Sequence, residues 1–235
     1  DTTPPDVFPP DPISLECNGP GGVDVTDPVV QAWLDEATAE DACYGAIPDV
    51  NNDAPALFPS GCPPGTETTV TFDATDGAGN MGSAQSSVTV QDTTEPTVSC
   101  QTAVDTLWPP NHKMVDVGLT FAASDVCDTN SLAVEITVTS DEDPLNAGGA
   151  GGPNHCPDAV VDGDTDLLRA ERSGSGDGRV YEITVSATDN CGNVGVCTTS
   201  VGVPKSRKPG SSPNDSGQGF DAETCEPSGI ASAFE

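Results

Sequence analysis

The sequence predicts an all-β protein of two tandem β-sandwich domains, with one short helix in the first domain and an extended C-terminal tail. Residues 74–80 (Ala-Thr-Asp-Gly-Ala-Gly-Asn) recur at 187–193 as Ala-Thr-Asp-Asn-Cys-Gly-Asn, and the Asp-Thr-Thr start of the chain recurs at 92–94. Apolar and polar residues alternate before and after each copy, as in half-buried strands. Apolar residues make up only 34% of the 235 positions, so each domain can bury only a thin core.

The repeat sets the expected boundaries. Because a turn and a linker occur together twice, one domain should end and the next begin near residue 91. We therefore expect a first domain at 1–91, a second at 92–203 and a tail at 204–235. The tail is rich in Gly, Ser, Pro and Asn, which is typical of an extended segment.

The first domain contains the one helix signal of the chain. Asp27 is a suitable N-cap and Pro28 fits the first helical position. Val30 and Trp33 then share one face, which predicts a short helix from residue 27 to about 38 with Trp33 in the core. The stretches 13–17, 69–74 and 87–90 alternate as strands, and the last two form a hairpin.

In the second domain a first strand contains Cys100, and residues 114–122 then alternate as a strand in which Val115, Val117, Leu119 and Phe121 can point inward. Residues 134–138 form the next predicted strand. The segments 167–171 and 180–185 flank a Gly-Ser-Gly-Asp-Gly turn and are predicted to pair as a hairpin. Arg169, Glu171 and Arg179 would then form cross-strand pairs on a solvated face.

Charge limits the classes of partner. The chain has 38 acidic and 7 basic residues, for a net charge of −31. This excess disfavours nucleic acid and anionic membrane surfaces, because nothing offsets the repulsion from phosphate. Two interpretations remain, a highly soluble surface or the binding of divalent cations.

The nine cysteines favour an oxidising compartment, so we expect an extracellular protein, secreted or on the cell surface. No apolar run reaches membrane-spanning length, and membrane insertion is not expected. We expect Asp1 to follow a removed export signal.

Several motifs of the first domain occur in a fixed order. They are Phe-Pro-Ser-Gly at 58–61, Thr-Val-x-Phe-x-Ala-Thr-Asp-x-x-Gly-Asn at 69–80 and Val-x-Val at 88–90. This set resembles the hyalin-repeat (HYR) family. The resemblance implies an immunoglobulin-like sandwich and a role in secreted or cell-surface adhesive proteins. Leu-Trp-Pro-Pro-Asn-His-Lys at 107–113 also resembles repeats of bacterial surface proteins.

In an immunoglobulin-like sandwich the N-terminus, the B–C turn and the F–G turn lie at the same end. This topology predicts two calcium sites, one at the start of each domain, because calcium accepts carboxylate and carbonyl oxygens from irregular turns. The site at the joint between the domains would use Asp92, Asp125, Asp128, Asp189 and Asn193, and the first-domain site would use Asp1, Glu40, Asp41, Asp76 and Asn80. The alternative is that Asp76 and Asp189 only cap their own turns. A looser calcium loop is a further hypothesis for Asp158, Asp162, Asp164 and Asp166.

The same topology predicts disulfides. Cys127 and Cys191 lie in the B–C and F–G turns, and Cys100 and Cys197 lie on the first and last strands, so each pair should bond. The hyalin-repeat resemblance implies the same first-to-last-strand bridge. In the first domain both Cys43–Cys62 and Cys17–Cys62 stay open, and Cys156 and Cys225 have no assigned partner. An odd cysteine indicates either a bond between subunits or a free thiol.

No catalytic motif is present, so we do not expect an enzyme. The predicted function is a structural protein of the cell exterior, either a subunit of a surface fibre or filament or the stalk of an adhesin, stiffened by disulfides and calcium. We expect homo-oligomers through the domain ends and the tail, with residues 220–234 gripping a neighbour by strand addition or a Cys225 disulfide. Packing of that segment on its own domains is the competing expectation. The alternative function is a glycan- or protein-binding adhesion module, which an exposed Trp108 or Tyr44 in a cleft would favour.

Overall fold

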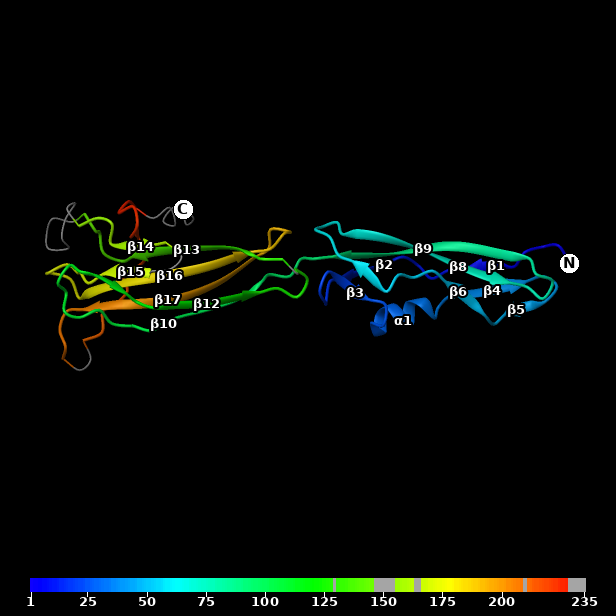
Figure 1. Cartoon of the computed structure of the whole chain (residues 1–235), viewed down its shortest axis with the longest axis horizontal. Coiled ribbons are helices and arrows are strands. Elements are labelled where there is room, and N and C mark those ends of the chain that lie inside the picture. The colour runs from blue at the N-terminus through cyan, green and yellow to red at the C-terminus, as the bar shows by residue number, and fades with distance from the viewer. Residues whose placement is uncertain (129, 146–154, 163–165, 209–210, 228–235) are drawn as a thin grey trace. The chain divides into compact units, whose positions relative to one another are not determined.

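The computed structural model describes all residues except 129, 146–154, 163–165, 209–210 and 228–235. The chain is nearly all β, with one helix among the described residues, and it divides into two compact units (Figure 1). Unit 1 comprises Asp1–Glu95, Asp125–Leu132 and Asp189–Asn193, and unit 2 comprises Pro96–Ser124, Ala133–Thr188 and Val194–Glu235. Two loops assigned to the second domain from the sequence are therefore part of unit 1.

The described residues of unit 1 form three β-sheets and one short helix. Its largest sheet has the order β2–β9–β8–β6, in which β2 runs parallel to β9 and the other pairs are antiparallel. The described strands of this unit are β1 (Asp6–Phe8), β2 (Ile13–Glu16), β3 (Gly22–Asp24), β4 (Thr38–Asp41), β5 (Gly45–Ile47), β6 (Val50–Asn52), β7 (Leu57–Pro59), β8 (Thr66–Thr75) and β9 (Met81–Gln91). The predicted hairpin is the β8–β9 pair, which is longer at both ends than the sequence pattern indicated.

The core of unit 1 lies between the β8–β9 hairpin and the helix α1 (Pro28–Leu34). As predicted, Asp27 caps α1, because its Oδ1 accepts a hydrogen bond from the Val29 N–H at 2.8 Å. The helix ends earlier than predicted, at Leu34. Trp33 is buried, its ring meets Phe72 edge-on at 5.6 Å, and its Nε1 donates to the Asp11 carbonyl oxygen at 2.7 Å.

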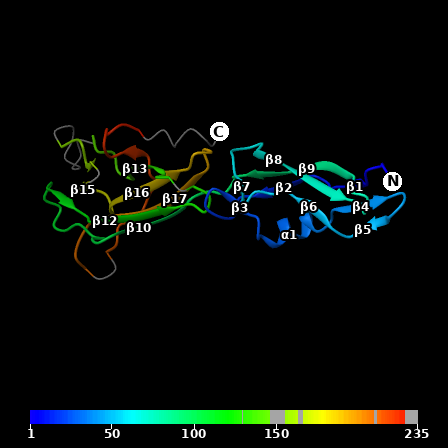
Figure 2. The same ribbon diagram turned by 45° about the vertical axis from the view of Figure 1, so that its right-hand side comes forward.

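The described residues of unit 2 form strands but no helix. Its longest sheet has the order β17–β16–β13–β18, and smaller sheets join β10 to β12 and β11–β15–β14. Figure 2 labels β10, β12, β13, β15, β16 and β17 of this unit. The strands are β10 (Thr97–Thr102), β11 (Met114–Asp116), β12 (Leu119–Ser124), β13 (Ala133–Ser140), β14 (Ala159–Val161), β15 (Asp166–Arg169), β16 (Gly178–Thr188), β17 (Val194–Pro204) and β18 (Phe220–Asp221). Its core contains Leu107, Leu168, Tyr181 and Ile183.

The predicted continuous strand at 114–122 is wrong. Gly118 adopts a left-handed backbone with φ of 62°, and the chain passes there from β11 to β12, which belong to different sheets. The break interrupts the alternation, so Val117 is buried while Phe121 is exposed.

The predicted hairpin of 167–171 with 180–185 is also wrong. β15 pairs with β11 and β14, whereas β16 pairs with β13 and β17. Consequently Glu171 and Arg179 are not on a solvated face, and both are fully buried. Arg179 forms ion pairs with Asp158 and Glu142, and it donates to the Tyr181 hydroxyl oxygen at 3.0 Å.

The disulfides differ in part from the prediction. Cys100 bonds to Cys197, as expected, and links β10 to β17. The expected Cys127–Cys191 bond is wrong, because the structure has Cys17–Cys127 and Cys62–Cys191, both inside unit 1. The 125–132 loop lies against the residues after β2, where the Gly21 N–H donates to the Cys127 carbonyl oxygen at 2.9 Å, and this contact brings Cys17 to Cys127. The fourth bond is Cys156–Cys225, and Cys43 is a free, exposed thiol.

The described part of the tail packs on its own unit, which is the competing expectation from the sequence. β18 pairs with β13, and Cys225 bonds to Cys156 within unit 2. The predicted grip on a neighbour through Cys225 is therefore wrong. Ile230 and Phe234, which were predicted to contribute to docking, lie outside the described residues.

Candidate cation-binding clusters

Unit 1 contains two groups of acidic and amide side chains, and each residue of one group has a counterpart of the same type in the other. The first acidic cluster is Asp1, Asp41, Asp76 and Asn80, and the second acidic cluster is Asp92, Asp125, Asp189 and Asn193. In each cluster one aspartate comes from an Asp-Thr-Thr segment, one precedes a cysteine by two residues, and one opens a turn with asparagine four residues later. The clusters are therefore two copies of one arrangement.

The turn aspartates cap their own turns, as the alternative hypothesis held. Asp76 Oδ1 accepts from the N–H groups of Ala78 and Asn80, each at 2.8 Å, and Asn80 Nδ2 donates to Oδ2 at 2.8 Å. Burial alone would raise the pKa of Asp76, but these hydrogen bonds outweigh it and hold the pKa below its usual value. The cap keeps the carboxylate ionised and fixed in orientation.

The second cluster repeats this cap. Asp189 Oδ1 accepts from the N–H groups of Cys191 and Asn193 at 2.8 Å, and Asn193 Nδ2 donates to Asp189 Oδ2 at 2.7 Å. Asn193 Nδ2 also lies 3.4 Å from the Asp92 carbonyl oxygen, as Asn80 Nδ2 does from that of Asp1. The two asparagines were predicted to be metal ligands, and in the structure their amide nitrogens tie the leading segment to the turn.

Asp41 and Asp125 supply the unsatisfied oxygens. Asp41 Oδ1 accepts from the N–H groups of Cys43 and Tyr44, and Asp125 Oδ1 accepts from those of Cys127 and Asp128, at 2.7 to 2.9 Å. The Oδ2 atom of each is buried and has no hydrogen-bond partner in the described part of the chain. Asp41 is only 3% exposed, so water does not satisfy this oxygen freely.

These aspartates are close to the leading segments. One potential ligand atom each of Asp1, Asp41 and Cys43 lie within 4.8 Å of one another, and Asp92, Asp125 and Cys127 form the same group. The Cys127 sulfur is in a disulfide and is not available as a thiolate, so the donors of the second group are carboxylates. Oxygen donors of this kind suit hard cations such as Ca²⁺.

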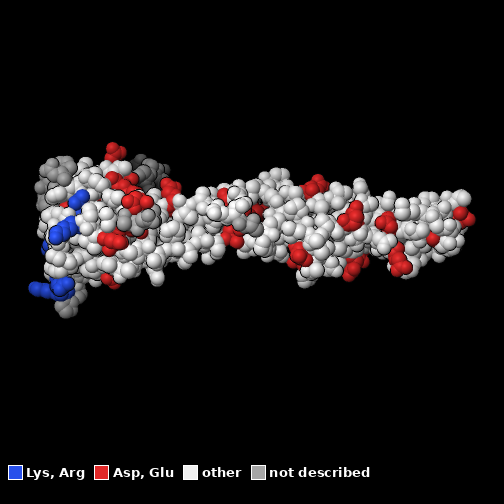
Figure 3. Space-filling view, viewed as in Figure 1, with Lys and Arg blue, Asp and Glu red and all other residues white. Residues whose placement is uncertain are grey.

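Unit 1 contains no positive side chain. All seven Lys and Arg residues and both histidines fall within unit 2, and the basic atoms visible in Figure 3 lie over that unit. Asp92 is 3% exposed, and its pKa is raised by burial and by the charges of Asp125, Asp189 and Asp128. These carboxylates therefore have no positive side chain within their own unit to offset their repulsion.

Three other predicted ligands have different roles. Asp128 accepts from the Asn190 N–H and Nδ2, both at 2.8 Å, and so holds the β16–β17 turn. Glu40 is exposed and points away from buried Asp41, because neighbours on β4 face opposite sides. Asp158, from the third acidic stretch, is buried in ion pairs with Arg169 and Arg179, and Asp164 lies outside the described residues.

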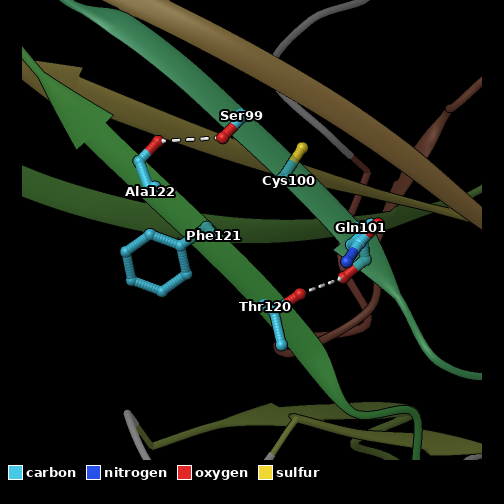
Figure 4. Close-up of a pocket in the computed structure, with 6 residues that line it drawn as sticks. All are labelled: Ser99, Cys100, Gln101, Thr120, Phe121 and Ala122. Atoms are coloured by element: carbon cyan, nitrogen blue, oxygen red, sulfur yellow. Dashed lines mark hydrogen bonds between the residues drawn. The ribbon is translucent and has the colours of Figure 1, made fainter.

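A shallow depression lies on the β10–β12 pair of unit 2. It has a volume of about 340 Å³ and is lined by Ser99, Cys100, Gln101, Thr120, Phe121 and Ala122 (Figure 4). The Ser99 hydroxyl donates to the Ala122 carbonyl oxygen and the Thr120 hydroxyl to that of Gln101, each at 3.5 Å. The cysteine is in a disulfide, so the lining offers no free acid, base or thiol for catalysis.

No helix in the described part of the chain is long and apolar enough to cross a membrane.

No protein-family profile and no curated protein matches the chain. Among solved structures, the chain is similar to the protocadherin gamma C5 EC1–3 fragment, with 13% identity and a TM-score of 0.34 over 84% of this chain and 67% of that one. It is also similar to the fibronectin(III)-like modules of Clostridium thermocellum CbhA, with 12% identity and a TM-score of 0.28 over 84% of this chain and 92% of that one. A third match is the Clostridium perfringens ZmpB structure with CBM51-2 and INT domains, with 14% identity, a TM-score of 0.26, and coverage of 77% of this chain and 29% of that one.

Proposed function

We propose that this chain is a non-enzymatic extracellular structural module whose two acidic clusters bind calcium, and that it serves as a subunit of a surface fibre or as the stalk of an adhesin. One observation carries the proposal. Each cluster leaves a carboxylate oxygen buried without a hydrogen-bond partner among the described residues, in a unit that has no basic side chain. An ionised oxygen in that position is costly unless a cation accompanies it.

The ligands differ from the full predicted set. Asp1, Asp41 and Asp76 would hold calcium in the first cluster, and Asp92, Asp125 and Asp189 in the second. Carbonyl oxygens and water would complete the six to eight oxygens that calcium takes. Asn80 and Asn193 would keep the turn carboxylates aimed, because they already hold one oxygen of Asp76 and of Asp189.

Calcium would act on stability and order. It would cancel the repulsion among Asp92, Asp125 and Asp189 that raises the pKa of Asp92. It would also fix the loops 125–132 and 189–193, which the Cys17–Cys127 and Cys62–Cys191 bonds already tie into unit 1. Four disulfides among the described cysteines support an oxidising, extracellular setting.

The first test is a thermal melt of the full chain in chelator and in excess calcium, with calorimetric titration of Ca²⁺. Binding to the folded state alone would add about 2.7 kcal/mol at 100 times the dissociation constant. Asp41→Asn should remove one of the two binding events, whereas Glu40→Gln, one residue away and exposed, should leave both. An unchanged melting midpoint for the unmodified chain would remove calcium from the proposal.

The fibre role needs a separate test. Light scattering and negative-stain microscopy at rising protein concentration, with calcium present, should show end-to-end assemblies. A monomer at every concentration would rule out the fibre subunit and leave the stalk.

The adhesion module is the second candidate, and one observation favours it. Tyr44 is exposed, and its N–H donates to Asp41 in the first acidic cluster, so an aromatic ring adjoins a candidate calcium site. A glycan array probed with calcium-loaded chain should then give signals that Tyr44→Ala abolishes. No signal above background would discard this candidate.

A further inference from the structure

The only two histidines of the chain meet at a buried glutamate in unit 2. His112 lies just before β11, His155 lies before β14, and Glu171 follows β15. Because β15 pairs with both β11 and β14, the three-stranded sheet brings these three residues to one end. The three residues are far apart in the sequence, and their spacing matches no known metal-binding motif.

The nitrogens converge on one carboxylate. His112 Nδ1 lies 2.6 Å from Glu171 Oε2, and His155 Nδ1 lies 3.3 Å from the same oxygen. The two imidazole rings stack with their centroids 4.7 Å apart and their planes 23° apart. One ligand atom from each residue lies within 4.8 Å of the others, which is compact enough for a single ion.

The group is left unsatisfied within the described residues. Glu171 is 0% exposed, and its Oε1 is buried with no hydrogen-bond partner there. His155 Nδ1 is likewise buried and, although it lies 3.3 Å from Glu171 Oε2, has no hydrogen-bond partner among the described residues. A buried carboxylate oxygen and a buried imidazole nitrogen thus lie side by side without a hydrogen-bond partner. Their lone pairs could both be satisfied by a bound metal ion.

The neighbouring arginines make their hydrogen bonds and ion pairs with other groups, and Arg172 Nε and Arg179 Nη2 are buried without a hydrogen-bond partner among the described residues. Arg169 pairs with Asp158 and donates to the carbonyl oxygens of His112 and Pro157, and Arg172 donates to the carbonyl oxygens of Ser173 and Lys205. Arg179 pairs with Asp158 and Glu142. In the described part of the chain, the ion pairs of Glu171 are with His112 and His155 and not with a guanidinium.

The backbone holds the ligands and leaves access. The His112 N–H donates to the Ala170 carbonyl oxygen at 3.0 Å, and the Ala170 N–H donates to that of Lys113 at 2.9 Å, so His112 is clamped beside Glu171. His112 keeps a left-handed φ of 62°, which is uncommon for a residue with a side chain. The side chains of His112 and His155 are 46% and 38% exposed above the buried glutamate, so an ion can enter from solvent.

We propose that His112, His155 and Glu171 form a binding site for a late first-row divalent metal ion, for which zinc is the probe. Imidazole nitrogen with one carboxylate suits zinc and its neighbours in the series, whereas calcium and magnesium prefer oxygen ligands. Three protein ligands leave a coordination position for water or a further group. The site is independent of the acidic clusters, which lie in unit 1.

The test is calorimetric titration of Zn²⁺ into the full chain with calcium in excess, so that the acidic clusters cannot supply the signal. We expect one zinc per chain, and a loss of affinity of at least about tenfold in His155→Asn and in Glu171→Gln. The matched control Asp125→Asn, which alters the second acidic cluster, should bind zinc as the unmodified chain does. Equal affinity in all variants would overturn the proposal.

A second measurement avoids dependence on the folding of the variants. With only two histidines, the imidazole signals of the unmodified chain can be followed by NMR during a zinc titration. Both rings should shift at the same zinc concentrations, and magnesium should shift neither. Zinc binding that leaves both imidazoles unmoved, or no binding at all, would show that the group is only a histidine–glutamate ion pair.

Discussion

Asn80 donates from Nδ2 to Asp76 Oδ2 at 2.8 Å, and Asn193 makes the same bond to Asp189 at 2.7 Å. In both copies the amide nitrogen also lies 3.4 Å from the carbonyl oxygen of the leading aspartate. The asparagine therefore joins the end of one turn to the start of the segment beside it. It is the centre of the repeated motif, and the carboxylates are arranged around it.

Replacing Asn193 by Ala should destabilise the folded chain. The change removes a hydrogen bond to a carboxylate and leaves buried Asp189 with one oxygen less satisfied, at a cost of about 1.5–3 kcal/mol. Urea unfolding with calcium absent measures it. Asn214→Ala is the control, because exposed Asn214 donates only to its neighbour's carbonyl oxygen. Equal losses in the two variants would mean that the amide does not hold the turn.

Much of this motif follows from the sequence, and some of it does not. The repeated turn motif identified the turns, and the expected immunoglobulin-like topology predicted that Asp1 and Asp92 lie beside them. The direction of the asparagine amide was not predictable. It depends on which neighbours need a donor, and here a carboxylate and a carbonyl oxygen both do.

The wrong predictions for unit 2, which are the 167–171/180–185 hairpin and the solvated face of its charged residues, have one cause. Alternation predicts that a strand exists, but strand order decides which faces are buried. A hairpin between 167–171 and 180–185 predicts that Glu171 and Arg179 lie on the surface. In the structure β15 and β16 belong to different sheets, so this prediction is wrong. The burial of these charges, and the meeting of His112 with His155, follow from a pairing that local patterns do not encode.

Replacing Asp92 by Asn should stabilise the chain without calcium and should reduce the stabilisation that calcium gives. Asn keeps the size of the side chain and its acceptor for the Thr94 N–H, but it removes a charge that burial and the nearby Asp125, Asp189 and Asp128 oppose. In chelator the variant should melt a few degrees above the unmodified chain. Addition of calcium should raise the melting temperature of the variant less than that of the unmodified chain, since one ligand is gone. A variant that melts lower in chelator would contradict the inferred repulsion.

The pH dependence follows from the carboxyls whose pKa is raised. Burial is the first cause in each case, and the groups are Asp92, Asp141, Glu142, Asp166 and Glu223. The folded state then binds more protons than the unfolded state, so the free energy of unfolding should rise as pH falls from 7 to about 5 in chelator. Below about 4 the trend should reverse, because Glu16, Asp24, Asp27 and Asp76 have lowered pKa values and lose favourable hydrogen bonds on protonation. Urea titrations at several pH values measure the curve, and a steady fall from pH 7 downward would disagree.

The disulfides give a prediction that needs no variant. Peptide mapping without reductant should recover Cys17 with Cys127, Cys62 with Cys191, Cys100 with Cys197 and Cys156 with Cys225. Iodoacetamide should label Cys43 alone, because its thiol is free and exposed. Recovery of a Cys127–Cys191 peptide would restore the pairing expected from the sequence and would remove both cross-links to residues of the first domain.

Arg179 gives the sharpest test of the buried charges. Its guanidinium is fully buried and pairs with Asp158 and Glu142, so Arg179→Met would leave carboxylates in the core with less compensation. Breaking such a pair costs about 3–5 kcal/mol, and because Arg169 still reaches Asp158 at 3.1 Å, we expect the lower part of that range. Arg207→Met, at an exposed position, should change stability by less than about 0.5 kcal/mol. The two variants lose the same charge, so a difference between them in urea unfolding reports burial and not net charge. Equal and small losses would return Arg179 to the solvated face that the sequence pattern predicts.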